Sequence, residues 1–192
     1  GFSLHTVLVG NPGTGKTTVA RILARIYKAL GILERGHIVE TDRQGLVAGF
    51  VGQTAIKTSE RIDEALGGVL FIDEAYALSN FNGIQGDFGN EAIQTILKRM
   101  EDLRGHFFVF VAGYPDNMEN FLKANPGLSS RFDKTLKFND YTPAQLEAIA
   151  LKMLDDEGYK LAAKASVYFT EILTELYEKR DKYFGNARTV RK

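Results

Sequence analysis

Short runs of apolar residues alternate along this chain with stretches in which apolar residues recur every three or four positions. The apolar runs cover residues 6–9, 37–39, 69–72, 107–112 and 135–138. Continuous apolar runs of this length are typical of strands that are buried on both faces of a sheet. The pattern predicts an α/β fold, with a five-stranded parallel sheet between two layers of helices.

Two apolar stripes between these runs predict helices that pack on the sheet. The first stripe consists of Val19, Ile22, Leu23, Ile26 and Leu30. The second consists of Ile93, Ile96, Leu97 and Met100. A glycine at position 31 can end the first helix, because glycine readily adopts the left-handed conformation found there.

The alternation stops after Asp140, and only helical patterns follow. Thr142 and Pro143 form a typical helix start, with a capping residue followed by proline at the first helical position. A further helix is expected over residues 164–183, closed by Gly185 and Asn186. The chain is therefore predicted to divide into an α/β core at residues 1–140 and a small α-helical part at residues 141–192.

Composition narrows the function classes without naming one. The 192 residues are 44% hydrophobic, enough for a sizeable core, and contain no cysteine, so that a disulfide framework or a thiolate metal site is excluded. Lys plus Arg and Asp plus Glu both number 24, which argues against nucleic acid as a partner. No apolar run approaches the length of a membrane span. We expect a soluble, cytoplasmic domain that has no membrane partner.

One motif carries most of the chemical information. Residues 10–17 match the pattern G-x-x-x-x-G-K-[ST] of a phosphate-binding loop; they are Gly10, Asn11, Pro12, Gly13, Thr14, Gly15, Lys16 and Thr17. The motif lies between a predicted strand and a predicted helix, which is the context that its mechanism requires. We predict a P-loop NTPase core, a three-layer sandwich that binds ATP and Mg²⁺.

Each part of the motif has an expected role. Glycines allow backbone N–H groups to turn toward the phosphates, and the helix N-terminus adds its dipole. Lys16 is expected to reach the β- and γ-phosphates, and the Thr17 hydroxyl to bind Mg²⁺. Thr18 is also expected among the nucleotide-binding residues.

Two carboxylates follow the apolar run that ends at residue 72. Asp73 is placed at the carboxyl edge of the sheet, where ligands of such folds bind, and is predicted to hold Mg²⁺, commonly through water. Glu74 is predicted to polarise the attacking water as a general base. Lys16 and Glu74 are thus the expected catalytic residues within the core.

Two arginines could add positive charge near the γ-phosphate. Arg131 follows a glycine-bearing loop before the last predicted strand, and Arg188 opens the final helical segment. Spacing alone leaves Arg131 either an ordinary surface charge or a finger that reaches a neighbouring subunit. It equally leaves Arg188 either a solvated helix end or a nucleotide contact.

These elements, in this order, resemble the AAA+ ATPases over nearly the whole chain. The strings at residues 45–55, 67–76 and 125–132 narrow the resemblance to the CbbX/CfxQ/SpoVK branch, which includes the red-type Rubisco activase and a stage V sporulation protein K. The resemblance implies a hexameric ring with ATP at subunit interfaces. It also implies a finger role in trans for Arg131, a second-sensor role for Arg188, and a place for Phe50 on a loop that faces a central pore.

The residues around Phe50 agree with a mobile loop, since Gly49 and Gly52 flank a large apolar side chain. The chain departs from the family elsewhere. Many AAA+ proteins end the fourth strand with a polar residue that orients the lytic water, and Tyr114 is the nearest candidate here for this first sensor. The predicted lid is also shorter than is usual, which suggests an excised domain with an incomplete lid.

The leading hypothesis is a motor in which ATP hydrolysis drives the remodelling of a protein client through a hexamer pore. A small-molecule kinase, a nucleic-acid-directed motor and a nucleotide-binding module without hydrolysis are the alternatives. Glu74 directly after the predicted magnesium ligand favours water as the phosphoryl acceptor. The client remains open among Rubisco, a spore-assembly factor and a secretion component.

Overall fold

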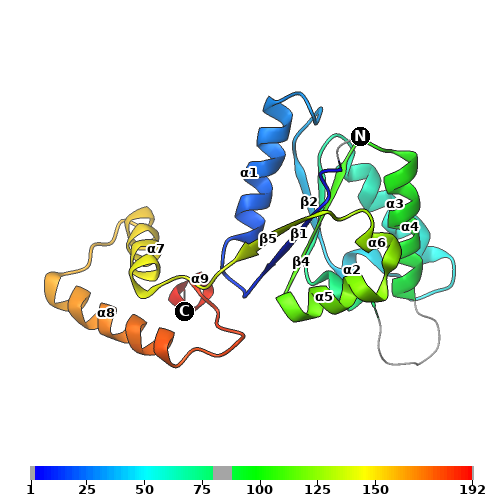
Figure 1. Ribbon diagram of the computed structural model, residues 1–192. Helices are drawn as coiled ribbons and strands as arrows, with labels where there is room; N and C mark the ends of the chain where they lie inside the picture. Colours follow the sequence, from blue (N-terminus) through cyan, green and yellow to red (C-terminus); the bar gives the residue numbers. More distant parts are fainter. Residues whose placement is uncertain (1–2, 80–87, 192) are drawn as a thin grey trace. The chain divides into compact units, whose positions relative to one another are not determined.

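The computed structural model describes residues 3–79 and 88–191 (Figure 1). Its residues form two compact units. The first comprises Gly1–Val9 and Lys16–Lys137, and the second comprises Gly10–Gly15 and Phe138–Lys192. The segment Gly10–Gly15, called the glycine loop below, therefore groups with the C-terminal helices, although its neighbours on both sides in the chain belong to the first unit.

A five-stranded sheet forms the centre of the first unit, in the order β2-β3-β4-β1-β5. The strands are β1 (Thr6–Gly10), β2 (Ile38–Thr41), β3 (Val69–Ile72), β4 (Phe108–Gly113) and β5 (Lys134–Phe138). β3 pairs in parallel with β2 and with β4, and β4 pairs in parallel with β1. The predicted α/β fold with five strands is confirmed.

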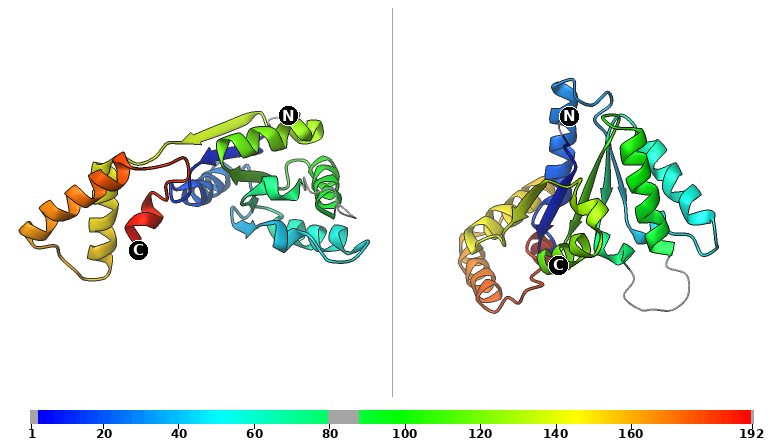
Figure 2. Two further views of the ribbon diagram at one scale, coloured as in Figure 1. Left: turned by 90° about the horizontal axis from the view of Figure 1, so that it is seen from below. Right: turned by 45° about the vertical axis from the view of Figure 1, so that its right-hand side comes forward.

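Helices cover both faces of this sheet, as Figures 1 and 2 show. On one face lies α1 (Lys16–Ala29), where the Tyr27 ring meets the rings of Phe108 and Phe110 with centroids 5.9 and 6.4 Å apart. The other face packs against α3 (Gln53–Ala65) and α4 (Phe88–Asp102). Because side chains alternate along a strand, β1, β3 and β4 are buried throughout.

The face that α1 buries differs from the expected apolar stripe. Ala20 and Ala24 are fully buried, whereas Ile22, Ile26 and Leu30 are 48%, 44% and 67% exposed. Small side chains four residues apart let the helix axis lie close to the sheet, and the larger aliphatic residues then point outward. The predicted helix is present, but the predicted buried face was wrong.

Short elements follow the carboxyl ends of β2, β3 and β4 in this unit. They are α2 (Arg43–Leu46), the 3₁₀ helix η1 (Ala75–Leu78), α5 (Pro115–Ala124) and α6 (Pro126–Ser129). α2 and η1 are joined by Arg43, whose Nη1 donates to the carbonyl of Ala77 at 2.7 Å. β2 and β5 form the edges of the sheet, and the side chains of Lys134 and Lys137 on β5 are exposed, as suits an unpaired edge.

The C-terminal helices of the second unit are α7 (Pro143–Asp156), α8 (Ala163–Glu178) and α9 (Ala187–Arg191). α7 begins with a capping box, in which Thr142 and Gln145 each accept a hydrogen bond from the backbone N–H of the other. α8 ends at Glu178, five residues before the expected end, because Phe184 has to turn back into a small core with Leu146 and Leu173.

Among the described residues, no helix is both long and apolar enough to cross a membrane.

His5 lies directly before β1 and is 9% exposed. Its Nδ1 accepts a hydrogen bond from the backbone N–H of Val109 at 2.9 Å, which requires that nitrogen to be unprotonated. Burial lowers the pKa of His5 to about 4, and the positive charge of Arg131 acts in the same direction.

The folded state should therefore lose stability when the pH falls from 6.5 toward 4. In this range the unfolded chain protonates His5 and the folded chain does not, so that the free energy of unfolding falls by up to about 3 kcal/mol. Urea unfolding of the wild type at pH 7 and pH 5 measures the loss, and His5→Gln should reduce it. The matched control is His106→Gln at an exposed position. An unchanged pH dependence in His5→Gln would contradict this assignment.

Candidate functional site

The glycine loop joins the end of β1 to the start of α1. Gly13 and Gly15 have φ values of 71° and 93°, which is backbone that residues with a side chain rarely adopt. α1 begins at Lys16, so that Lys16, Thr17 and Thr18 form its first turn and the N-terminal end of the helix dipole lies at the loop. Residues 11–15 thus form the connection between a buried strand and a helix start.

Close packing leaves no room for a side chain at Gly10 or at Gly13, whatever the φ angle. A Cβ atom on Gly10 would lie 2.5 Å from the carbonyl oxygen of Phe138, and one on Gly13 would lie 2.2 Å from that of Gly185. Within the loop, the buried Thr14 hydroxyl donates to the carbonyl of Asn11 at 2.7 Å. The loop is therefore held in one shape by its own residues and by the segments that flank it.

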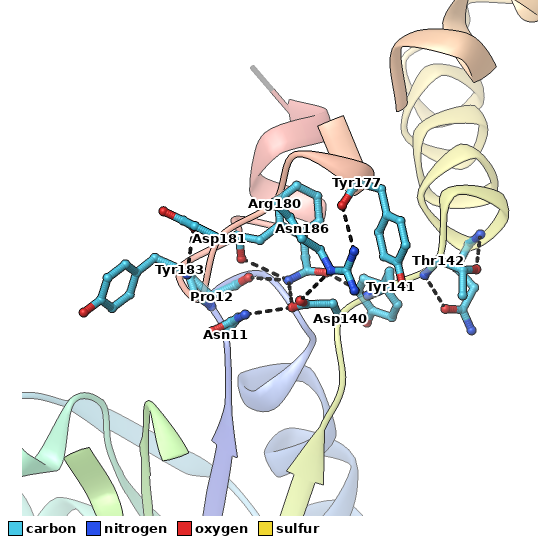
Figure 3. A network of polar contacts seen from close by, with 12 residues as sticks. Asn11, Pro12, Asp140, Tyr141, Thr142, Tyr177, Arg180, Asp181, Tyr183 and Asn186 are labelled. Carbon is cyan, nitrogen blue, oxygen red and sulfur yellow. Dashed lines mark hydrogen bonds and ion pairs between the residues drawn. The ribbon is translucent and has the colours of Figure 1, made fainter. Parts of the chain in front are cut away.

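A polar network around Asp140 joins the glycine loop to the C-terminal segment of the same unit (Figure 3). Asp140 Oδ1 accepts from Asn11 Nδ2 at 2.9 Å and from Asn186 Nδ2 at 2.8 Å. Its Oδ2 lies 3.4 Å from Nε of Arg180, whose guanidinium stacks on the Tyr177 ring at 3.7 Å. The carboxylate of Asp140 thus connects its own segment to the glycine loop and to residues 180–186.

Sequence reasoning missed this network. The sequence pattern indicates Asp140 only as a boundary and Asn186 only as the end of a helix. Asn186 is in fact fully buried with φ 48°, a conformation that asparagine tolerates better than most residues. An asparagine after a glycine signals such backbone, but nothing in the sequence indicates that its amide would be buried against the loop at residues 10–15.

Asp73 and Glu74 follow β3, two strands away from β1 in the sheet. Asp73 Oδ1 accepts a hydrogen bond from the backbone N–H of Glu74 at 3.0 Å, and the N–H of Asp73 donates to the carbonyl of Thr41 at 2.9 Å. Glu74 is exposed and has φ 48° and ψ 46°. Left-handed backbone is unfavourable for glutamate by roughly 1–2 kcal/mol, and such strain is concentrated at functional sites.

A cavity of about 330 Å³ opens beside these carboxylates. It is lined by Glu40, Thr41, Asp42, Gly45, Arg61, Phe71, Asp73 and Glu74. Glu40 pairs with Arg21, and Arg61 pairs with Glu64 at 2.8 Å. Asp73 and Glu74 thus line solvent-accessible space on the carboxyl side of the sheet, and the sequence does not indicate that Glu40, Asp42 and Arg61 join them.

Tyr114 directly follows β4 and is the capping residue of α5. Its ring centroid lies 6.5 Å from that of Tyr76, two residues after Glu74. Gly113 permits this arrangement, since a Cβ there would lie 3.0 Å from Tyr76 Cδ1. The residue expected as a first sensor therefore lies at the same sheet edge as the segment that carries Glu74.

Arg131 lies between α6 and β5 and contacts residues of its own chain. Its Nη1 donates to the carbonyl of Gly127 at 3.0 Å, and its Nη2 is 3.7 Å from Glu101 Oε2. The hydrogen bond from Arg104 lowers the pKa of Glu101, and the charge of Arg131 adds to this effect. The two side chains are 32% and 54% exposed and the pair is therefore reached by solvent, so we expect it to contribute little to stability.

Arg188 and Phe50 both have accessible side chains. Arg188 is an exposed residue of α9, and its backbone belongs to the same compact unit as the glycine loop. Phe50 is 71% exposed and its neighbour Val51 is 88% exposed, on the segment between α2 and α3. Phe50 is therefore outside the core.

The residues present fit a magnesium ion that is held chiefly by water and phosphate. Among residues 3–79 and 88–191, no group of three or more His, Cys, Asp or Glu side chains could hold a metal ion. Thr17 offers a hydroxyl and Asp73 a carboxylate, which are oxygen ligands. Mg²⁺ usually keeps several waters and takes only one or two carboxylates from the protein when it binds with a phosphate substrate.

The left-handed backbone at Glu74 predicts an inverted order of stability between two substitutions. Glu74→Gly should be more stable than Glu74→Ala by about 1 kcal/mol, because both remove the carboxylate and only alanine keeps the Cβ that is unfavourable there. Urea denaturation of the two variants gives the difference.

The control pair is Glu119→Gly and Glu119→Ala in the middle of α5, where alanine should be the more stable by about 1 kcal/mol. If the alanine variant were also the more stable at position 74, the backbone of Glu74 would not be left-handed in solution.

Known proteins resemble the chain over almost all of its length. It is 43% identical over 190 residues to stage V sporulation protein K of Bacillus subtilis, 42% identical over 189 residues to protein CbbX of Cereibacter sphaeroides, and 42% identical over 188 residues to a chloroplastic ribulose bisphosphate carboxylase/oxygenase activase of Cyanidioschyzon merolae. Each match covers 98% of this chain but only 58%, 60% and 63% of the relative. The resemblance to the CbbX/CfxQ/SpoVK branch is confirmed.

A solved structure shows the same fold at low sequence identity. The FIGL-1 AAA domain, crystallised in complex with ADP, superposes with a TM-score of 0.63 over 98% of this chain and 58% of its own, at 18% identity. Family models match twice along the sequence. Residues 142–192 match the AAA lid domain, and residues 6–140 match the ATPase family associated with various cellular activities. The chain belongs to this family, the AAA ATPases.

Proposed function

We propose that this chain binds ATP with Mg²⁺ and that the protein which contains it hydrolyses ATP to remodel a protein client. The single observation that carries the proposal is the stretch of residues 10–18, in which a glycine loop with two positive φ angles connects a buried strand to a helix start. Backbone N–H groups in such a loop and the helix dipole together favour bound phosphate.

The side chains of this stretch have complementary roles in the proposal. Lys16 binds the β- and γ-phosphates through its positive charge, and the hydroxyl of Thr17 is a ligand of Mg²⁺. Asp73 holds the same ion, directly or through water. Mg²⁺ held by Thr17 and Asp73 would supply positive charge that stabilises the phosphoryl group during its transfer.

Glu74 is the proposed general base. Its side chain is exposed beside a cavity, so a water molecule can reach it, and its strained backbone is held by the hydrogen bond to Asp73. A carboxylate that accepts a proton from the attacking water must lie within hydrogen-bond reach of it. Tyr114 is the proposed first sensor, since it follows β4 at the same edge of the sheet.

We assign residues 1–140 to the ATP-binding core and residues 141–192 to the lid. Arg188 on the lid is proposed to contact the nucleotide. Arg131 is proposed to act on the nucleotide of a neighbouring subunit in a hexameric ring. Its weak, exposed pairing with Glu101 can be given up at little cost when a neighbouring phosphate offers a stronger partner.

Phe50 is the proposed client contact in the pore of that ring. A highly exposed phenylalanine next to a highly exposed valine offers an apolar grip that does not depend on the client's sequence. Two relatives suggest the class of client, because their names describe a Rubisco activase and a sporulation protein. A protein client is therefore favoured over nucleic acid, which the zero net charge also disfavours.

Two substitutions separate binding from hydrolysis. Glu74→Gln should keep ATP affinity but lower turnover by roughly a hundredfold or more, because the amide cannot accept the proton. Lys16→Ala should weaken ATP binding itself. Calorimetric titration with ATP and steady-state phosphate release measure the two effects separately. Normal turnover in Glu74→Gln would remove this residue from the mechanism.

The exposed position of Phe50 predicts a small effect on stability and a large effect on client binding when its side chain is removed. Phe50→Ala should change the free energy of unfolding by less than about 0.5 kcal/mol, whereas Phe121→Ala in the core should cost about 3–5 kcal/mol. In the whole protein Phe50→Ala should also keep basal ATP hydrolysis within a few-fold and lose stimulation by a denatured polypeptide. Full stimulation in Phe50→Ala would exclude its side chain as the grip.

A further inference from the structure

Three consecutive carbonyl groups of the glycine loop are held by donors from the C-terminal part of the same unit. The carbonyl of Pro12 accepts from Asn186 Nδ2 at 3.4 Å, and that of Gly13 accepts from the backbone N–H of Ala187 at 3.1 Å. The carbonyl of Thr14 accepts from the Tyr141 hydroxyl at 2.9 Å. These donors come from the segments before α7 and at the start of α9 (Figure 3).

The directions of these carbonyls determine the directions of the N–H groups that follow them in the chain. The described peptide bonds are all trans, and in a planar trans peptide the C=O of one residue points opposite to the N–H of the next. The donors that hold the carbonyls of residues 12, 13 and 14 therefore turn the N–H groups of Gly13, Thr14 and Gly15 away from those donors. These are the N–H groups that the proposed function assigns to phosphate binding.

The donors are themselves held firmly. Asn186 is fully buried, and its Oδ1 accepts from the backbone N–H of Tyr141 at 2.7 Å. Its Nδ2 also donates to Asp140 Oδ1 and to the carbonyl of Phe184 at 3.0 Å, so that its two hydrogens are shared among three acceptors, of which the Pro12 carbonyl is the most distant. One asparagine thus links the segment of Tyr141 to the segment of Ala187, so that both present their donors to the loop together.

We propose that Tyr141 and Asn186 are positioning residues that aim the phosphate-binding N–H groups of the glycine loop by holding its carbonyls. Neither side chain needs to touch the nucleotide. The inference rests on the proposed function, since it assumes that the loop binds the phosphates of ATP. It adds that nucleotide affinity is set partly by residues 141 and 186, outside the motif.

Nucleotide affinity is then coupled to the contacts that the C-terminal segment makes with the glycine loop. If held carbonyls favour bound phosphate, bound phosphate must equally favour the held carbonyls, because coupling between two binding events is reciprocal. Nucleotide binding would thus tighten the contacts of Asn186 and Tyr141 to the loop, and nucleotide loss would loosen them.

Tyr141→Phe is the decisive variant, because it removes one hydrogen bond and leaves the ring in place. It should weaken ADP and ATP binding alike by roughly three- to tenfold, the effect of one lost hydrogen bond. The turnover number at saturating ATP should stay within about twofold of the wild type, so that KM rises and kcat does not fall. Tyr159→Phe, at a tyrosine that is 67% exposed in the same unit, is the matched control and should change neither value.

Asn186→Gly is the second variant, since glycine accepts the backbone conformation and removes all the side-chain bonds. It should weaken nucleotide binding more than Tyr141→Phe does. Should Asn186→Gly fail to fold, Tyr141→Phe alone decides. Calorimetric titration with ADP and with a non-hydrolysable ATP analogue gives the affinities, and phosphate release gives KM and kcat.

Lys16→Ala separates a failure of the positioning role from a failure of the proposed function. If Lys16→Ala loses nucleotide binding while Tyr141→Phe binds as tightly as the wild type, the positioning role is wrong and the proposed function stands. A Tyr141→Phe variant with normal affinity and a reduced kcat would also overturn the positioning role. If Lys16→Ala itself binds normally, the proposed function is wrong.

Discussion

In the proposed function the glycine loop binds phosphate through its backbone, which requires its own carbonyl oxygens to point away from the ligand. The organisation of the second unit agrees with that constraint. The glycine loop has few side chains with which to fix its shape. Its conformation is instead fixed by two left-handed glycines and by external donors to the carbonyls of Pro12, Gly13 and Thr14. This explains why the loop forms a compact unit with Phe138–Lys192 rather than with the strand and helix that it joins.

The same constraint accounts for the polar residues of the C-terminal segment that contact the glycine loop. A buried carboxylate or amide is costly unless it is hydrogen-bonded. The partly buried Asp140 meets this condition through Asn11, Asn186 and Arg180, and the fully buried Asn186 meets it through four partners. A fully satisfied network of this kind favours a single geometry, because any other arrangement leaves buried polar groups without partners.

Asp73 and Glu74 at the sheet edge are positioned by strand pairing rather than by a polar network. Asp73 and Glu74 are placed by β3, whose parallel neighbours β2 and β4 fix its register. The left-handed backbone of Glu74 is tolerated because its N–H is bound by Asp73 and η1 begins immediately after it. The strain turns the chain sharply at the end of the strand, beside a cavity that a water molecule can enter.

The sequence by itself determined the five strands, the α/β class, the loop at residues 10–17 and the carboxylates after β3, because these depend on local periodicity and on short motifs. Tertiary structure alone decided which face of α1 is buried, where α8 ends, and that Asp140, Tyr141 and Asn186 meet the glycine loop. Hydrophobic pattern gives the period of a helix but not how closely it approaches a sheet. Contacts between residues separated by more than a hundred positions, such as Tyr141 and Thr14, leave no trace in local sequence, since they exist only after the chain has folded.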